Sequence, residues 1–199
     1  MSDSAKTILL CGVGGQGTIL AADLLARAAI ASGDDVKLSE IHGMAQRGGA
    51  VTTVVRVGRA VGTMVADIGD ADFLISFETT EALRNIAYLK QDGIAIVSDE
   101  TIKPLTALTG RVPMPRGARK TLSDFGALVT PAELLARQAG SVKSVNVVLL
   151  GVLSTFLDYD EAVWLDVIRG RVPERFVDMN LKAFSLGRSF ARDRAGQMG

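Results

Sequence analysis

Four glycines in six residues stand out near the start of the chain, in the stretch Gly12-Val13-Gly14-Gly15-Gln16-Gly17. Glycine lets a chain turn tightly and leaves room for a flat or charged group against the backbone. An apolar run, Thr7–Cys11, precedes this turn, and an alanine-rich helical pattern begins near Thr18. Because the first amides of a helix have no partner inside the helix, such a turn favours an anion. We therefore predict a cofactor-binding turn at Gly12, Gly14, Gly15, Gln16, Gly17 and Thr18.

Three interpretations of this turn differ in the ligand. Gly-x-Gly-x-x-Gly fits a dinucleotide-binding turn, in which Glu40 near the end of the next strand would meet a ribose hydroxyl. The glycines could also serve only to let the chain turn. A phosphate loop of the nucleotide-hydrolysing type is disfavoured, because Thr18 stands where that loop needs a lysine.

A second stretch of unusual content is Ile41–Gly49, which reads Ile-His-Gly-Met-Ala-Gln-Arg-Gly-Gly and has neither strand nor helix periodicity. His42 is the only histidine, which excludes a catalytic histidine pair or a multi-histidine metal site for this chain alone. Arg47 can form a forked pair with a phosphate or carboxylate. We take His42, Gln46 and Arg47 as candidate catalytic residues; the alternatives are a purely structural role for His42 and a solvated loop arginine or structural ion pair for Arg47.

The segments around these motifs predict an α/β fold: a Rossmann-like, mostly parallel sheet with flanking helices, an antiparallel hairpin and C-terminal helices. At the carboxyl edge of such a sheet the glycine turn and the His42 loop would lie together. Strands are expected at Thr7–Cys11, Val36–Ile41, Ala50–Val57, Phe73–Phe77 and Ile94–Val97, with a hairpin from Val57 into Thr63–Val65. Helices are expected at Ala21–Ala31, Thr80–Leu89 (capped by Thr79), Pro131–Ala139 (capped by Thr130), Ser144–Phe156, Asp160–Arg169 and Pro173–Arg192. Prolines and basic residues leave Glu100–Leu122 unassigned.

Composition limits the possible partners. The 199 residues suit one domain spanning 1–199, and 22 basic residues balance 22 acidic ones, so no field attracts nucleic acid or a membrane surface. The single cysteine, Cys11, excludes an internal disulfide and cannot supply the ligands of an iron–sulfur cluster. We interpret it as a buried strand residue rather than a nucleophile. No signal pattern or membrane-length apolar run is seen, which favours a cytoplasmic protein.

Taken together, the two motifs resemble the gamma subunit or domain of the 2-oxoacid:ferredoxin oxidoreductases, and within that family most closely the small (beta) subunit of the indolepyruvate enzymes. The resemblance is carried by Gly12–Thr18 and by Ser39–Gly49, in the correct order and spacing. Asn146–Gly151 and Asn180–Phe184 add weaker support. It covers nearly the whole chain and is loosest between Ile102 and Leu128.

The resemblance implies an enzyme complex that decarboxylates an arylpyruvate on thiamine diphosphate, passes electrons through 4Fe-4S clusters to ferredoxin, and forms an acyl-coenzyme A. This chain lacks the Gly-Asp-Gly start and paired asparagines of a thiamine site. It is therefore expected to hold none of these cofactors alone. A large alpha subunit would carry them, in a heterotetramer of two copies of each chain. The turn and the His42 loop would then close the partner's active site, with coenzyme A as one candidate ligand.

Two functions of other classes remain open at this point. One is a standalone nicotinamide- or flavin-binding module, in which Glu40 contacts the cofactor. The other is a noncatalytic scaffold subunit. The sequence does not decide which 2-oxoacid is used, or whether the turn contacts coenzyme A, thiamine diphosphate or only the partner.

Overall fold

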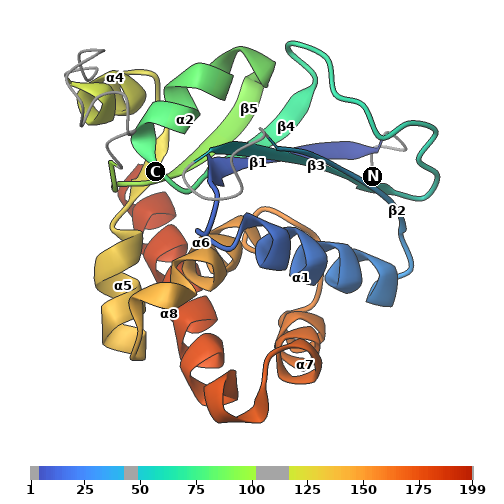
Figure 1. Cartoon of the computed structure of the whole chain (residues 1–199), viewed down its shortest axis with the longest axis vertical. Coiled ribbons are helices and arrows are strands. Elements are labelled where there is room, and N and C mark those ends of the chain that lie inside the picture. The colour runs from blue at the N-terminus through green and yellow to red at the C-terminus, as the bar shows by residue number, and fades with distance from the viewer. Residues whose placement is uncertain (1–4, 43–48, 102–116, 199) are drawn as a thin grey trace.

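A computed structural model describes residues 5–42, 49–101 and 117–198. Among these residues, six strands form one sheet in the order β2-β3-β1-β4-β5-β6 (Figure 1). The α/β class predicted from the sequence is confirmed. The strands are β1 (Lys6–Val13), β2 (Asp35–His42), β3 (Ala50–Gly58), β4 (Ala71–Ser76), β5 (Leu89–Ser98) and β6 (Leu128–Thr130).

Helices cover the sheet unequally (Figure 1). Most of them lie on the face that α1 covers, whereas α2 and α4 lie on the opposite face. None of the helices in the described part of the chain is long and apolar enough to cross a membrane. They are α1 (Thr18–Ala31), α2 (Thr79–Asn85), α4 (Ala118–Asp124), α5 (Ala132–Ala139), α6 (Val145–Leu153), α7 (Glu161–Arg171) and α8 (Val177–Met198), with 3-10 turns η1 (Ile86–Tyr88), η2 (Val142–Ser144) and η3 (Glu174–Phe176).

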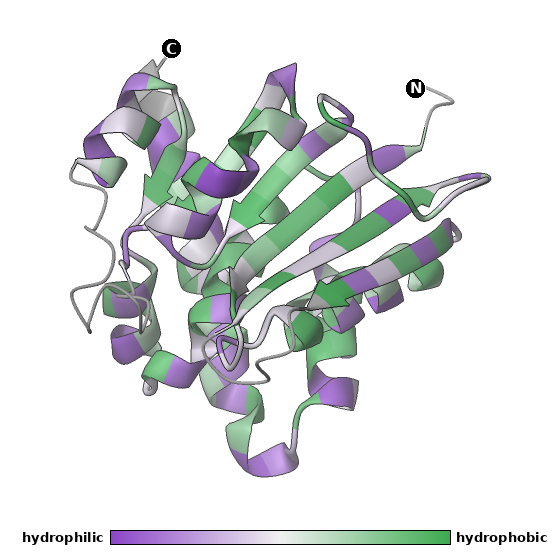
Figure 2. Ribbon diagram, turned by 45° about the horizontal axis from the view of Figure 1, so that its top comes forward, coloured by the Kyte–Doolittle hydropathy of each residue, from purple (hydrophilic) through white to green (hydrophobic). Residues whose placement is uncertain are grey.

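Strand β1 is buried on both faces, which explains its continuous apolar sequence. Ile8 and Leu10 point into a core shared with α1, α6 and α8. Leu9 and Cys11, whose side chains alternate with these, belong to a second core beneath α2 and α4. The hydropathy colouring shows the same apolar character along the central strands (Figure 2).

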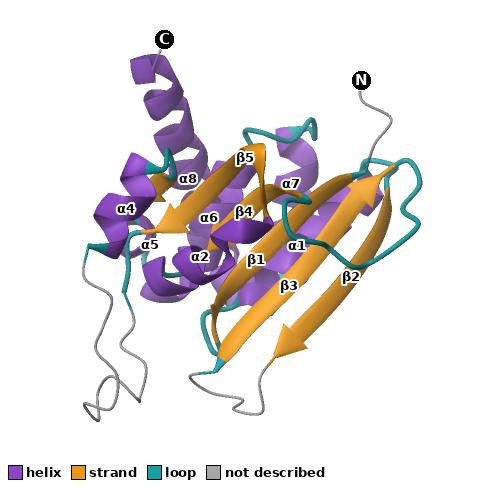
Figure 3. Ribbon diagram, turned by 90° about the horizontal axis from the view of Figure 1, so that it is seen from above, coloured by secondary structure: helices purple, strands orange, loops and turns teal. Residues whose placement is uncertain are grey.

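Only β3 runs against the other strands. It pairs antiparallel with both β1 and β2, while β1, β4, β5 and β6 are mutually parallel (Figure 3). The sheet is therefore mostly parallel, as expected. The sequence does not indicate that β3 inserts between β1 and β2, the two strands of the strand-helix-strand unit, because periodicity does not report strand order.

The strand order creates a crevice at the carboxyl edge of the sheet. The parallel neighbours β1 and β4 lead into α1 and α2, which lie on opposite faces (Figure 1). Such a point, where the connections part, is where open α/β sheets bind ligands. Both the glycine turn and the end of β4 lie there.

Helix α6 is fixed against α8 by two glycines. A Cβ on Gly151 of α6 would overlap the carbonyl oxygen of Phe184, and a Cβ on Gly187 of α8 would overlap that of Val148. The two backbones therefore approach more closely than any side chain allows. Gly151 and Gly187 let α6 sit deep in the molecule, with its residues from Val145 to Leu153 all buried.

The predicted hairpin into Thr63–Val65 is wrong. No strand occurs between residues 59 and 70, and this segment is instead tied to β3 through Arg56. The Arg56 guanidinium donates to Val65 O at 2.7 Å and pairs with Asp70 at 3.2 Å. The antiparallel partners of β3 are β1 and β2 instead. The later segment is held to β3 by the Arg56 side chain rather than by a strand ladder.

Two predicted helix starts are also wrong. Glu78, not Thr79, precedes the first residue of α2, and its carboxylate accepts the capping bonds. The predicted helix Thr80–Leu89 stops at Asn85, because Leu89 already belongs to β5. Pro131 takes the cap position of α5 in place of Thr130, which ends β6. The three-residue strand β6 was too short to be recognised by periodicity.

Candidate functional site

The glycine turn joins β1 to α1 at the crevice. Gly17 takes the position before the first helical residue, with φ 82° and ψ 26°, a left-handed conformation that glycine adopts at little cost. No side chain caps α1. Among the described residues no side chain bonds to the first amides of this 14-residue helix, so these amides can receive a ligand or solvent.

The segment that carries the second motif begins and ends beside this turn. The Gly14 amide donates to Gly49 O at 2.8 Å. Val51 of β3 lies opposite Gly12 on one side and opposite His42 on the other, so His42 and Gly12 are two strands apart at one register. The structure thus brings the ends of both motifs to one edge. Gln46 and Arg47 lie outside the described residues.

A cavity of about 590 Å³ opens directly in front of the turn, a volume in the usual range for small-molecule sites. Gly15, Gln16 and Gly17 form one wall, and residues of α1, α5, η2, α6 and the segment after β5 form the others. Of the other predicted turn residues, Gly12 and Thr18 are buried, and Gly14 is bonded to Gly49 as described above. The remaining lining residues are Leu20, Glu100, Glu133, Val142, Lys143, Val145 and Asn146.

Two carboxyl groups meet in the wall of this cavity, and sequence reasoning missed both. Glu100 follows β5, and Glu133 lies in the first turn of α5. A hydrogen bond to Glu133, burial, and the charges of Glu133 and Asp99 raise the pKa of Glu100 to about 7. Bonds from Glu100 and Arg137 lower the pKa of Glu133. The pair therefore shares a proton near neutral pH. The available signal was an acidic residue at the carboxyl end of a strand.

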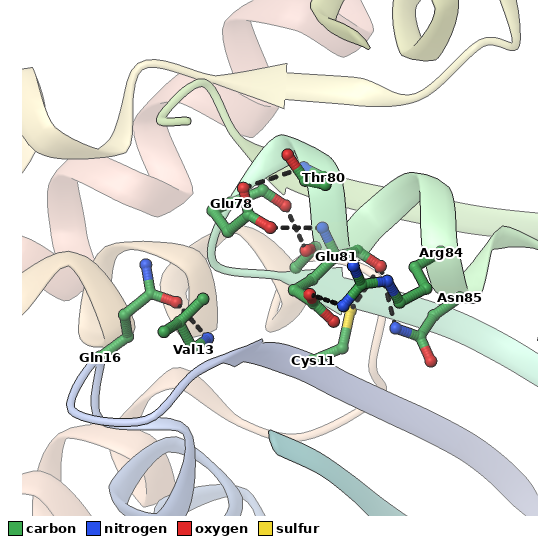
Figure 4. Close-up of polar contacts among 9 residues, drawn as sticks. Cys11, Val13, Gln16, Glu78, Thr80, Glu81, Arg84 and Asn85 are labelled. Atoms are coloured by element: carbon green, nitrogen blue, oxygen red, sulfur yellow. Dashed lines mark hydrogen bonds and ion pairs between the residues drawn. The ribbon is translucent and has the colours of Figure 1, made fainter. Parts of the chain in front are cut away.

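A third group of polar residues lies in α2 and at its N-terminal cap, just beyond the end of β4 (Figure 4). Glu78 is 1% exposed, and its carboxylate accepts bonds from the amides of Thr80, at 2.9 Å, and Glu81. Burial raises the pKa of Glu81, whose carboxylate pairs with Arg84 at 2.6 Å. Because the Glu78 carboxylate caps α2, we interpret this group as structural support for the crevice.

Cys11 lies next to that group and behaves as the sequence predicts. Its side chain is fully buried and directs its thiol to Glu81 O at 3.6 Å. Burial raises the pKa of the thiol to about 12, so almost no thiolate exists at neutral pH. A thiol in this state is neither a nucleophile nor a metal ligand. Within residues 5–42, 49–101 and 117–198 no group of three or more potential ligand side chains could hold a metal ion.

Glu40 is poorly placed for a dinucleotide. In that class of fold the acidic residue stands on the strand next to the glycine turn. Here β3 separates β2 from β1, and Glu40 lies opposite Thr53 of β3. The insertion moves Glu40 one strand further away, about 4.8 Å in the hydrogen-bonding direction. The dinucleotide interpretation therefore loses its second contact.

Comparison with known proteins gives consistent results. The family model described as pyruvate ferredoxin/flavodoxin oxidoreductase matches residues 7–190. The chain is 41% identical to the indolepyruvate oxidoreductase subunit IorB of Thermococcus kodakarensis, over 95% of this chain and 97% of that protein. It is 34% identical to the subunit of the same name from Methanothermobacter thermautotrophicus, over 90% and 94%.

Solved structures agree on the fold. The gamma subunit of a keto/oxoacid ferredoxin oxidoreductase from Geobacter sulfurreducens superimposes with a TM-score of 0.70 at 26% identity, over 94% of this chain and 99% of that one. A 2-oxoglutarate:ferredoxin oxidoreductase from Magnetococcus marinus, solved with 2-oxoglutarate, coenzyme A and succinyl-CoA, superimposes with a TM-score of 0.74 at 21% identity. The match covers 96% of this chain but 32% of that one, so the same fold also occurs inside a longer chain.

Proposed function

The chain belongs to the pyruvate ferredoxin/flavodoxin oxidoreductase family, and from this premise we propose that it is the small subunit of a cytoplasmic indolepyruvate:ferredoxin oxidoreductase. The complex would oxidatively decarboxylate an arylpyruvate to its acyl-coenzyme A and pass the electrons to ferredoxin. The observation that carries this proposal is the 41% identity that extends over 95% of this chain and 97% of an indolepyruvate oxidoreductase subunit. Agreement along the full length of both chains favours the same place in the same kind of complex.

The residues of this chain do not fit the redox cofactors of such a complex. A 4Fe-4S cluster takes four cysteine thiolates, and the sequence has one cysteine, which is buried and protonated. We therefore assign the clusters and thiamine diphosphate to a larger companion subunit. The assembly would contain two copies of each chain.

The contact between the ends of the two motifs supports a shared role for them. The Gly14 amide donates to Gly49 O, which places the end of the Ile41–Gly49 motif against the glycine turn. We propose that the turn and this motif together close the active site of the companion subunit. Backbone amides at the start of α1 would receive a phosphate or carboxylate, with coenzyme A as the first candidate. Arg47 and Gln46 would orient that group, and His42 would donate a hydrogen bond or transfer a proton.

Co-purification tests the proposal most directly. A tagged version of this chain, expressed anaerobically in its own host, should recover a large cysteine-rich partner with bound thiamine diphosphate and iron. The recovered complex should reduce ferredoxin when given indolepyruvate and coenzyme A, whereas this chain alone should be inactive. Recovery of the chain without such a partner would contradict the proposal.

The two alternative functions make different predictions. A standalone nicotinamide or flavin module would bind NAD or a flavin tightly in equilibrium titrations of the isolated chain, and the subunit proposal expects no tight binding. A scaffold subunit would lose assembly, but not turnover per assembled complex, when the His42 segment is altered. Because β3 separates Glu40 from the glycine turn, the position of Glu40 supports binding of neither NAD nor a flavin.

A further inference from the structure

Two glycines of the turn lie against carboxamide side chains. A Cβ on Gly12 would stand 2.7 Å from Oε1 of Gln16, and a Cβ on Gly17 would stand 2.7 Å from Nδ2 of Asn146. Neither distance is one that a real Cβ adopts. A Cβ on Gly12 would also stand 3.0 Å from Cβ of Phe77, and Gly17 has φ 82°. The packing of the turn therefore favours glycine at both positions, with no need for a ligand that approaches the backbone there.

The Gln16 side chain joins the ends of two neighbouring strands, and Figure 4 shows its bond to Val13. Its Oε1 accepts from the Val13 amide at 2.7 Å, and its Nε2 donates to Phe77 O at 3.1 Å, one residue beyond β4. The carboxamide oxygen thus accepts from the end of β1, and the carboxamide nitrogen donates to the residue that follows β4. The turn is thereby fixed to the far side of the crevice.

The Asn146 side chain fixes the turn from the helical side. It is 3% exposed, and its Nδ2 donates to Gly17 O at 3.2 Å while its Oδ1 accepts from the Val147 amide at 2.9 Å. Gly17 O also accepts from the Ala21 amide at 3.1 Å. Because the peptide unit is planar, holding the Gly17 carbonyl also fixes the direction of the Thr18 N–H.

Gly15 differs from the other two glycines. It is exposed and lines the cavity, and no atom of the described residues lies within 4 Å of the place where its Cβ would be. The open side of the turn is therefore at Gly15, between the two positions held by amides. A ligand that enters the cavity meets the turn there.

We propose that Gln16 and Asn146 are positioning residues, which hold the glycine turn in one conformation so that the backbone at Gly15 and the start of α1 faces a ligand in the cavity. This inference rests on the proposed function, because that function supplies the ligand, an anionic group such as a phosphate of coenzyme A. A turn fixed in advance binds without the cost of ordering itself. Gln16 lines the cavity but acts through the turn, because both ends of its carboxamide bond to the backbone.

The chemistry of the two side chains suits this role. A neutral carboxamide both donates and accepts, and each of the two uses one bond of each kind. A carboxylate of the same shape would keep the accepted bond, lose the donated one and add a negative charge beside the site of an anion. Gln16→Glu and Asn146→Asp are therefore informative variants.

The test uses the assembled complex and the full chain. Gln16→Met removes both bonds at similar side-chain length, and Asn146→Ala removes both bonds of the second amide. Asn180→Ala is the matched control, because Asn180 is also a buried amide that donates to a backbone carbonyl, that of Phe176, at 2.8 Å. The measurements are KM for coenzyme A, kcat, the midpoint of thermal unfolding, and hydrogen exchange of the amides from Val13 to Ala21 and of Val147.

We expect Gln16→Met and Asn146→Ala each to raise KM for coenzyme A about tenfold with kcat changed by less than about threefold, the loss expected for one hydrogen-bonded clamp. Exchange at the turn should accelerate, while thermal unfolding changes no more than in Asn180→Ala. Compared with Gln16→Met, Gln16→Glu should restore protection of the Val13 amide from exchange. Compared with Asn146→Ala, Asn146→Asp should restore protection of the Val147 amide. Neither carboxylate variant should restore KM for coenzyme A.

Two results would overturn the inference. Unchanged exchange at the turn in Gln16→Met would show that the side chain does not hold it, whatever the complex does. Accelerated exchange with KM equal to that of Asn180→Ala would show that the held conformation does not serve the ligand. Gln16→Met decides both points even where Asn146→Ala does not fold. Failure of the proposed function is separate, because it appears in the wild-type chain as absence of a companion subunit.

Discussion

The carboxyl group of Glu100, just beyond β5, is hydrogen-bonded to that of Glu133 in the first turn of α5. This bond, burial and the charges of Glu133 and Asp99 together raise the pKa of Glu100 from 4.5 to about 7, so the folded chain binds a proton there that the unfolded chain releases. Stability from a raised carboxyl pKa is fully present below the unfolded value of 4.5 and is lost as pH rises through 7. The lowered pKa of Glu133 acts in the opposite direction and at lower pH.

The first prediction follows from that sign. Glu100→Gln keeps a donor for Glu133 but cannot titrate. As the pH rises from about 5 to about 8, the thermal unfolding midpoint of the wild type should decrease relative to that of Glu100→Gln. Glu174→Gln, which changes an exposed carboxylate in η3, is the control and should follow the wild type. Parallel pH profiles for the wild type and Glu100→Gln would show that the two carboxyls do not share a proton.

The second prediction concerns Cys11. Because its thiol is fully buried and its pKa is raised to about 12, alkylating reagents should leave it unmodified in the folded chain. Full modification should follow in denaturant, as measured by mass spectrometry. Fast labelling under native conditions would contradict the buried position of this cysteine.

The third prediction concerns the contact between α6 and α8. Gly187→Ala places a methyl group on the carbonyl of Val148 and should lower the free energy of unfolding by at least about 2 kcal/mol. Gly170→Ala on α7 is the matched control, since nothing lies within 4 Å of its Cβ position. The control should be neutral or stabilising by up to about 1 kcal/mol in urea unfolding. Equal stability of the two variants would mean that the helices are not in close backbone contact.

The fourth prediction tests Arg47. If its guanidinium holds a phosphate or carboxylate, Arg47→Ala should raise KM for coenzyme A in the complex by about 10- to 100-fold, the range for a charge-assisted bond. Arg27→Ala removes an exposed arginine of α1 that pairs with Asp23, and it should leave the kinetics unchanged. An unchanged KM and turnover in Arg47→Ala would remove the phosphate role.

The fifth prediction separates the two roles offered for His42. A proton-transfer role predicts that His42→Asn lowers kcat and removes an ionisation near neutral pH from its pH profile. A hydrogen-bonding role predicts a retained pH profile, because asparagine can still donate. Normal kcat and KM together with weaker assembly would instead indicate a scaffold role for this segment.

Much of the fold could be predicted because its signals are local. The apolar run of β1, the glycine turn and the alanine-rich α1 each follow from the residues within them. The order of the strands does not, since nothing in Ala50–Val57 indicates that it inserts between β1 and β2. The α2 cap was misplaced by one residue because the pattern favoured the hydroxyl of Thr79, whereas the carboxylate of Glu78 reaches two amides.

The candidate site was predicted in part for the same reason. The turn could be found from spacing alone. The Glu100–Glu133 pair could not, because the two residues are far apart in sequence and meet only through the parallel pairing of β5 and β6, which brings α5 to the crevice. The role of Gln16 inside the turn could not be predicted either, since its partner Phe77 follows β4 and is far away in the sequence.

The reversed direction of β3 has a consequence for how such a subunit can diversify. Because β3 starts at the edge where β1 and β2 end, the connection from His42 to Gly49 joins two antiparallel neighbours and carries no crossover. Insertions or deletions in this connection leave the pairing of every other strand unchanged. The length and sequence of this connection, which we propose faces a companion subunit, can therefore change without altering the strand order or the glycine turn.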